Sequence, residues 1–411
     1  MMRDNYLDVS KLTTDKEVMN LFTVVANHGG VLRFVGGAVR DALKGLKGSD
    51  LNLATDLSPE ELVEACSDAD IKTIPLGIKQ GSIGVVLKDK VVEISSLYKY
   101  VTNKDGATEI EFTDNWEEDA SRRDLTINAV YTDEKGNVFD YYNGIEDLEK
   151  GYVRFIGSAT GRIKEDYLRI LRYFRFYSLF GVEEPNKKAL EACCENRAGL
   201  KKVPMERIRD ELFKLIVTPD APRTYRLMQE NGILEYILPD AEYIDDLAYF
   251  NKAVGRGIID DEAVVKMFIL YRPNEALAEN MATRLKFNRQ QKQLFTALAK
   301  SPFLLEQINR PDIIKRLVYK EGQEVVRAKI AAAVAREQKE FEKVCSVYNE
   351  IKTFETHIFP LKGKDILENG LAEAKEVGLM LKKLEDNWIE SDFSLTKEQL
   401  LSQAKALKKA I

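Results

Sequence analysis

The feature that most constrains this chain is a short apolar stretch, residues 32–35, that runs into the glycine pair 36–37. A helix-forming segment follows, and a second short strand then carries Asp50 and Asn52 two residues apart. Side chains two apart on a strand share one face, and the bare N–H groups of a glycine turn can bind phosphate. The segment therefore predicts a phosphate-binding turn beside a metal-ligating strand. It matches neither the P-loop nor the dinucleotide-binding pattern.

Length and composition indicate a water-soluble protein of several domains. The chain has 411 residues, of which 45% are hydrophobic and 31% charged, and it holds no uninterrupted run of 18 apolar residues. We therefore expect no membrane association and, because the N-terminus lacks an apolar signal core, a cytoplasmic location. The four cysteines have neither zinc-site nor disulfide spacing. The chain has only two histidines, so histidine-based acid–base catalysis is not expected.

Charge is unevenly distributed along the chain. The net charge is −6, yet residues 150–216 contain 15 Lys and Arg against 9 Asp and Glu, a local excess of +6. An acidic protein with one basic segment is suited to holding one particular polyanion there rather than coating nucleic acid generally.

Residue periodicity divides the chain into a small head rich in strands and a long helical remainder. After a lead-in helix over 16–27, strands are expected at 32–35, 51–54, 82–87, 91–95, 127–131 and 138–141. The polar segment 99–113 has no periodicity and is expected to be a mobile loop. Beyond Gly151, apolar residues recur at helical spacing, for example over 167–180 and 371–384.

Metal-assisted nucleotidyl transfer uses two carboxylates to hold two Mg²⁺ ions. Asp50 is one candidate metal ligand, and Asn52 offers only a neutral amide oxygen at the second position. Glu93, an acid on an otherwise apolar strand, is the candidate for a further catalytic carboxylate, the alternative being an ordinary outward-facing strand residue.

Two charged motifs could bind a nucleotide. The arginines Arg122 and Arg123 could grip phosphate bidentately, and Asp124 could accept a hydrogen bond from a ribose hydroxyl. Residues 165–176 read as one helix on which Asp166 and Arg169, three apart, share a face. A carboxylate beside a guanidinium complements the amino group and ring nitrogen of cytosine or adenine and mismatches uracil and guanine.

In order, these motifs resemble those of the class II tRNA nucleotidyltransferases, the CCA-adding enzymes, which are related to bacterial poly(A) polymerases. The resemblance rests on 36–41, 50–52, 122–129, 139–148, 165–169 and 206–212, and more weakly on 359–365 and 388–393 of the bacterial and mitochondrial branch. It implies an α+β fold, with a polymerase-β-like head of a small mixed sheet and helices, followed by an elongated all-α neck, body and tail. The implied domains are a head (1–150), a neck with base recognition (151–220), and a body (221–350) and tail (351–411) that bind tRNA.

The resemblance also implies a reaction and roles for residues. The reaction is template-independent addition of C, C and A to tRNA 3′ ends from CTP and ATP with Mg²⁺, and no protein partner is implied. Asp50 and Asn52 would lie at the metal. The residues implied for nucleotide binding, including base choice by the last four, are Gly36, Gly37, Arg40, Arg122, Arg123, Asp124, Asn128, Asp166, Arg169, Arg172 and Arg175. Basic residues that could contact the tRNA backbone are Arg284, Lys286, Arg289 and Lys292.

Three positions depart from the family pattern. Asn52 replaces a metal-binding aspartate, whether natively or as an introduced change, Gln80 replaces a histidine, and Tyr98 replaces an arginine. These departures leave open partial addition (CC only or A only) and an inactive RNA-binding homologue. A poly(A) polymerase of the same class is a further alternative.

Overall fold

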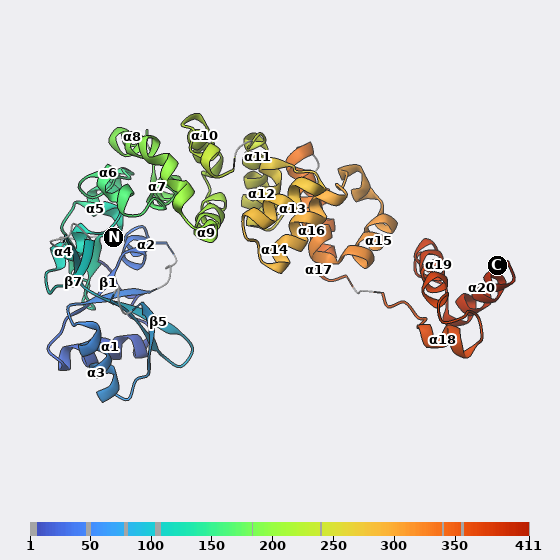
Figure 1. Ribbon diagram of the computed structural model, residues 1–411, viewed down its shortest axis with the longest axis horizontal. Coiled ribbons are helices and arrows are strands. Elements are labelled where there is room, and N and C mark those ends of the chain that lie inside the picture. Colours follow the sequence, from blue (N-terminus) through green and yellow to red (C-terminus); the bar gives the residue numbers. More distant parts are fainter. Residues whose placement is uncertain are drawn as a thin grey trace. The chain divides into compact units, whose positions relative to one another are not determined.

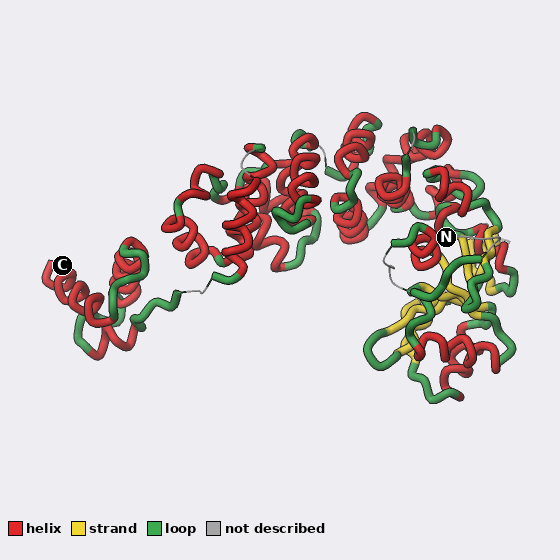
Figure 2. Tube along the Cα trace, turned by 180° about the vertical axis from the view of Figure 1, so that it is seen from behind, coloured by secondary structure: helices red, strands yellow, loops and turns green. Residues whose placement is uncertain are grey.

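The computed structural model describes residues 6–46, 51–77, 81–102, 108–182, 184–238, 241–338, 341–354 and 357–410. The chain forms two compact units, Met1–Pro239 and Asp240–Ile411. Figures 1 and 2 show that the strands belong to the first unit and that the second is helical. This agrees with the α+β architecture expected from the sequence.

The first unit is built on a mixed sheet with the strand order β3-β4-β5-β2-β1-β8-β9, in which only the β2–β5 pair is parallel among the described residues. A separate hairpin pairs β6 with β7. The strands are β1 (Leu32–Val35), β2 (Asn52–Thr55), β3 (Thr73–Gly77), β4 (Ser82–Val86), β5 (Val91–Ser96), β6 (Tyr98–Thr102), β7 (Thr108–Phe112), β8 (Val130–Thr132) and β9 (Val138–Asp140).

The central strands β1 and β2 carry buried side chains on both faces of the sheet. Phe34 and Leu53 enter the core that α1 (Lys16–Asn27) and α3 (Pro59–Asp68) cover, and Figure 1 shows these two helices side by side. Their neighbours Val35 and Ala54 enter the opposite core, beside α4 (Trp116–Ser121). Since strand side chains alternate, Asn52 lies on the same face as Ala54.

Local capping explains where the two covering helices begin. The Asp15 carboxylate accepts the backbone N–H groups of Glu17 and Val18 at the start of α1. At the start of α3, Ser58 and Glu61 form a reciprocal capping box. The sequence therefore specifies both helix starts without tertiary help.

The remaining helices of the first unit surround the end of the sheet and continue away from it. They are α2 (Gly37–Leu43), α5 (Gly144–Lys150), α6 (Ala159–Glu165), α7 (Arg169–Phe180), α8 (Lys187–Asn196), α9 (Met205–Ile216) and α10 (Ala221–Glu230). Helix α7 packs against both α9 and α10, with α9 beside the cavity described below.

All regular secondary structure among the described residues of the second unit is helical. The α-helices are α11 (Ile244–Gly255), α12 (Ala263–Tyr271), α13 (Glu275–Arg284), α14 (Arg289–Lys300), α15 (Pro311–Glu321), α16 (Gln323–Glu337), α17 (Phe341–Lys352), α18 (Gly363–Glu368), α19 (Val377–Glu390) and α20 (Lys397–Ala410). Trp388 lies in the buried cluster of the last three helices. In the described part of the chain, every helix is too short or too polar to span a lipid bilayer.

Three local expectations were wrong. Residues 98–102 and 108–112 form a hairpin where a loop was expected, because Tyr98, Tyr100 and Phe112 gain an apolar face only when the strands pair. The expected strand 127–131 begins as a 3₁₀ turn, 126–128, before β8. The last helix predicted from 371 begins at Val377 instead.

Candidate active site

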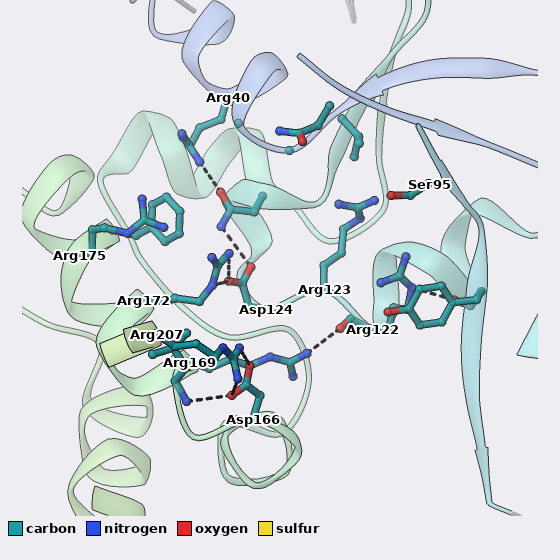
Figure 3. A pocket seen from close by; sticks show the side chains of 18 of the residues that line it. Arg40, Ser95, Arg122, Arg123, Asp124, Asp166, Arg169, Arg172, Arg175 and Arg207 are labelled. Carbon is teal, nitrogen blue, oxygen red and sulfur yellow. Dashed lines mark hydrogen bonds and ion pairs between the residues drawn. The ribbon is translucent and has the colours of Figure 1, made fainter. Parts of the chain in front are cut away.

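A cavity of about 550 Å³ opens in the first unit between the β1–α2 turn, strands β2 and β5, the hairpin, the segment after α4 and helices α7 and α9. Among the described residues that line it, seven are arginines and two are aspartates. Figure 3 shows these guanidinium groups arranged around one space. The charge and size suit a nucleoside triphosphate.

The glycine turn forms one wall of this cavity. Gly36 has φ of 66°, a backbone conformation that favours glycine, and a Cβ there would approach the Arg123 side chain at 3.9 Å. Gly37 begins α2 and also lines the cavity. The sequence-predicted turn is therefore next to the predicted arginines.

Arg40 and Asn128 begin a buried polar network. Arg40 donates from Nε and Nη2 to Asp41 Oδ1, at 2.9 and 2.7 Å, and from Nη1 to Asn128 Oδ1 at 2.6 Å. Asn128 Nδ2 in turn donates to Asp124 Oδ1 at 3.1 Å. Burial lowers the pKa of Arg40, although Asp41 opposes this. The guanidinium is thus fixed in orientation at the cavity wall.

The network continues from Asp124 to helices α7 and α9. Arg172 Nε donates to Asp124 Oδ2 at 2.6 Å, and Arg175 Nε donates to Glu211 Oε2 at 2.7 Å. Burial alone would raise the pKa of Asp124, but the Arg172 charge and its hydrogen bonds bring it to about 2. Asp124 is therefore an ionised anchor for Arg172, which changes the expectation that its carboxylate is available to a ribose hydroxyl.

Arg122 and Arg123 share a buried partner, Asp119. Arg123 donates from Nη2 to Asp119 Oδ2 at 3.0 Å, and Arg122 donates from Nε to Oδ1 at 2.9 Å. Arg122 also donates to the Tyr98 carbonyl at 2.9 Å, with its guanidinium 3.3 Å from the centre of the Tyr98 ring. The two arginines therefore face different parts of the cavity, and Arg123 is the one beside the glycine turn.

Asp166 and Arg169 both line the cavity, but the expectation of one continuous helix is wrong. Helix α6 ends at Glu165, Asp166 is extended with φ of −153°, and α7 begins at Arg169. The Asp166 carboxylate accepts the Leu168 N–H at 3.1 Å, which interrupts the helix locally.

Asp166 and Arg169, the pair expected from the sequence to recognise the base, do not contact each other in an ion pair but bind other residues. Arg207 Nη2 donates to Asp166 Oδ2 at 2.7 Å, whereas Arg169 Nη1 donates to Glu165 Oε2 at 2.5 Å (Figure 3 labels Asp166, Arg169 and Arg207). A nucleobase that uses Asp166 as an acceptor must therefore compete with Arg207.

The candidate metal ligands are only partly described. Asp50, like Gln80, lies outside the described residues. Asn52 lines the cavity, and its register partner on the parallel strand β5 is Glu93, so the two side chains share a face. Glu93 is exposed and is not among the residues that line the cavity. Amide and carboxylate oxygens suit Mg²⁺ in kind, but within the described residues no group of three acidic, His or Cys side chains could hold a metal.

Sequence reasoning missed several residues that complete the site. Asp119 and Glu211 form ion pairs with four of the predicted arginines, and Arg207 contacts Asp166 from α9. Glu211 and Arg207 lie in a segment that carried the family resemblance, 206–212, and this was the available signal. Ser95, Tyr98 and Tyr100 also line the cavity. Of these three, only Tyr98 had a signal in the sequence, through its departure from the family pattern.

Two family models match the chain, one over the sheet-containing part of the first unit and one from the first unit into the start of the second. Residues 32–154 match the family model described as the Poly A polymerase head domain. Residues 184–244 match the model described as a probable RNA and SrmB-binding site of polymerase A.

Similarity to individual proteins extends over nearly the whole chain. The chain is 34% identical over 404 residues to the human mitochondrial CCA tRNA nucleotidyltransferase 1, covering 95% of this chain and 89% of that protein. It is 28% identical to the CCA-adding enzyme of Lactobacillus johnsonii, covering 88% and 89%. The fold matches the crystal structure of the Bacillus stearothermophilus CCA-adding enzyme in complex with CTP, with a TM-score of 0.79, 24% identity and coverage of 96% and 99%.

Proposed function

The chain belongs to the class II CCA-adding tRNA nucleotidyltransferases, and from this premise we propose that it adds C, C and A to the 3′ end of tRNA. CTP and ATP are the substrates, and pyrophosphate is released. The observation that carries the proposal is the arginine-lined cavity, in which a glycine turn and a carboxylate–guanidinium pair face the same space.

The described residues suggest how a nucleotide is held. Gly36, Gly37 and Arg123 form the wall suited to the triphosphate, and Arg40 is fixed behind it through Asn128. Asp124 holds Arg172, so that residue presents a preoriented charge instead of a mobile one. Such preorganised cations stabilise charge that develops on phosphate oxygens during transfer.

Nucleotidyltransferases of this kind are generally divalent-metal dependent, and we propose Mg²⁺ as the ion. Asp50 and Asn52, with Glu93 on the adjacent strand, would hold it. When bound, Mg²⁺ neutralises phosphate charge and favours ionisation of the attacking 3′-hydroxyl. Asn52 contributes an amide oxygen without the negative charge of a carboxylate, which predicts weaker metal binding and slower turnover.

Base choice is assigned to Asp166 and Arg169. Cytosine and adenine each present an amino donor beside a ring-nitrogen acceptor, which a carboxylate and a guanidinium complement. Uracil and guanine leave that pair mismatched, and an unmatched polar site can discriminate by up to about 10⁴-fold. Asp166→Ala is expected to relax the choice of base more than it weakens triphosphate affinity. Equal losses of both would contradict the assignment.

Incorporation of labelled nucleotide tests the function. The chain and its Asn52→Asp variant are incubated with radiolabelled CTP or ATP and tRNA that lacks its last three nucleotides. We expect slow addition by the chain and at least tenfold faster CCA addition by the variant. Long A tails on generic RNA without CTP incorporation would indicate a poly(A) polymerase. Addition of CC or A only would narrow the specificity, and tRNA binding without addition by either form would indicate an inactive homologue.

The helical remainder is proposed to bind tRNA, with the body at 221–350 and the tail at 351–411. Arg284, Lys286 and Arg289 are exposed, whereas Lys292 is paired with Glu279 at 2.6 Å. If these residues contact phosphates, replacing the three exposed residues by glutamine should weaken tRNA binding and reduce its salt dependence. An unchanged salt slope would contradict their role.

A further inference from the structure

The hairpin β6–β7 presents an aromatic face at the edge of the cavity. Tyr98 and Tyr100 lie two apart on β6, with Phe112 and Ile110 as their register partners on β7. Tyr100 is 39% exposed and Phe112 38% exposed. On the opposite face, Lys99 binds Glu111 and Glu118. Strand alternation therefore places the aromatic side chains on one face of the hairpin, where Tyr98 is buried and Tyr100 is exposed.

The ring of Tyr98 is held in place by Arg122. The guanidinium lies 3.3 Å from the ring centre and donates from Nε to both the Tyr98 carbonyl and Asp119, each at 2.9 Å. Tyr100 packs edge-on against Tyr98, with ring centroids 5.6 Å apart and an interplanar angle of 80°. Arg122 thus supports an aromatic wall and has much of its hydrogen-bonding capacity committed to protein atoms.

This wall differs chemically from the rest of the cavity. Both tyrosines line the cavity with Ser95, whereas arginines and aspartates dominate the other walls. In nucleotidyl transfer the attacking oxygen and the leaving pyrophosphate lie roughly in line on opposite sides of the phosphorus. With the triphosphate against the glycine turn and the incoming base at Asp166 and Arg169, the wall left for the acceptor strand is the one formed by Ser95, Tyr98 and Tyr100.

We propose that Tyr98 and Tyr100 form the binding wall for the terminal nucleobase of the acceptor RNA, with Tyr100 stacking on the base and Tyr98 backing it. This proposal rests on the proposed function. Stacking on an aromatic ring accepts any base, because every base has a π face. Such a wall can therefore hold the discriminator base and each newly added C without a change of structure.

The proposal is tested by binding, which does not require turnover. The probe is an RNA minihelix that mimics the tRNA acceptor arm, lacks CCA and ends in 2-aminopurine, whose fluorescence falls when the base stacks. We expect quenching on binding to the full chain, and loss of quenching with about tenfold weaker binding in Tyr100→Ala. Tyr100→Phe should retain both, which separates stacking from hydroxyl hydrogen bonding.

Phe112→Ala is the matched control. Phe112 lies on the same face of the hairpin with similar exposure, but it is not among the residues that line the cavity. Its variant should quench like the original chain. A Tyr100→Ala variant that binds CTP less tightly while the RNA stays quenched would overturn the proposal and assign the ring to the incoming nucleotide.

RNA that binds the original chain without any quenching would also overturn the proposal. Failure of the proposed function would be recognised separately, as tRNA binding without nucleotide incorporation by either the chain or Asn52→Asp.

Discussion

Asp119 is expected to be a highly sensitive polar position among the described residues of the first unit. Its buried carboxylate binds Arg122, Arg123 and the Tyr131 hydroxyl, the last at 2.7 Å. Burial alone raises the pKa of Asp119, but the two arginines outweigh it and the pKa lies below its usual range. Asp119→Asn keeps the shape and removes the charge, which leaves two guanidinium groups without a counter-ion.

The loss of stability expected for Asp119→Asn follows from the burial of Asp119 and its two arginine partners. Removing one member of a buried ion pair costs about 3–5 kcal/mol. Because the side chains of Arg122 and Arg123 are 14% and 18% exposed, partial hydration favours the lower end of that range. A loss of about 3 kcal/mol in a unit of this size lowers the melting temperature by roughly 6–12 °C. Arg123 should also lose its orientation, with about tenfold weaker CTP binding.

Tryptophan fluorescence can isolate the first unit in this measurement. The chain has two tryptophans, Trp116 in the first unit and Trp388 in the second, and the Trp116 ring lies 5.4 Å from that of Tyr131. In a Trp388→Phe background, thermal melting followed by fluorescence reports the surroundings of Asp119.

Asp68→Asn serves as the matched control for this prediction. Asp68 pairs with His28 at 3.1 Å, but its side chain is 65% exposed, so its removal should cost less than about 1 kcal/mol. An Asp119→Asn melting temperature within about 2 °C of the Asp68→Asn value would refute the reasoning.

Further predictions concern acid stability and glycine packing. Because the folded pKa of Asp124, about 2, lies below the ordinary 3.8, its contribution is present above pH 4 and disappears as the pH falls towards 2. Asp124→Asn should therefore remove about 2 kcal/mol of pH-dependent stability over that window, measured by Trp116 fluorescence during acid titration, and an unchanged acid limb would contradict this. Gly144→Ala should destabilise the first unit by about 1–3 kcal/mol, since a Cβ would collide with the Thr126 carbonyl. Gly378→Ala, which meets no atom within 4 Å, should stabilise α19 by up to about 1 kcal/mol. Thermal melting followed by tryptophan fluorescence, from Trp116 for the first unit and Trp388 for the second, measures both changes in stability. Two variants that are both stabilised or both destabilised would count against the packing argument.

Local signals in the sequence were sufficient for the architecture and for the identity of most cavity residues. The apolar strand before Gly36 and the cap residues Asp15 and Ser58 influence only residues a few positions away in the sequence. Their structural effects can therefore be predicted from the sequence alone. The change along the chain from strands to helices is also visible in the spacing of the apolar residues. The order of the motifs carried the family resemblance, and the comparisons confirmed it.

The tertiary structure alone decided which groups meet. Asp124 binds Arg172, 48 residues away, and Asp166 binds Arg207, 41 residues away, so neither partner could be derived from local spacing. The break at Asp166 coincides with a local contact, in which its carboxylate accepts the Leu168 N–H, and the same carboxylate also binds Arg207 of another helix. The sequence determines which charged side chains each helix carries. Which of them form ion pairs depends on burial and on the packing of α7 against α9, and only the folded protein provides these.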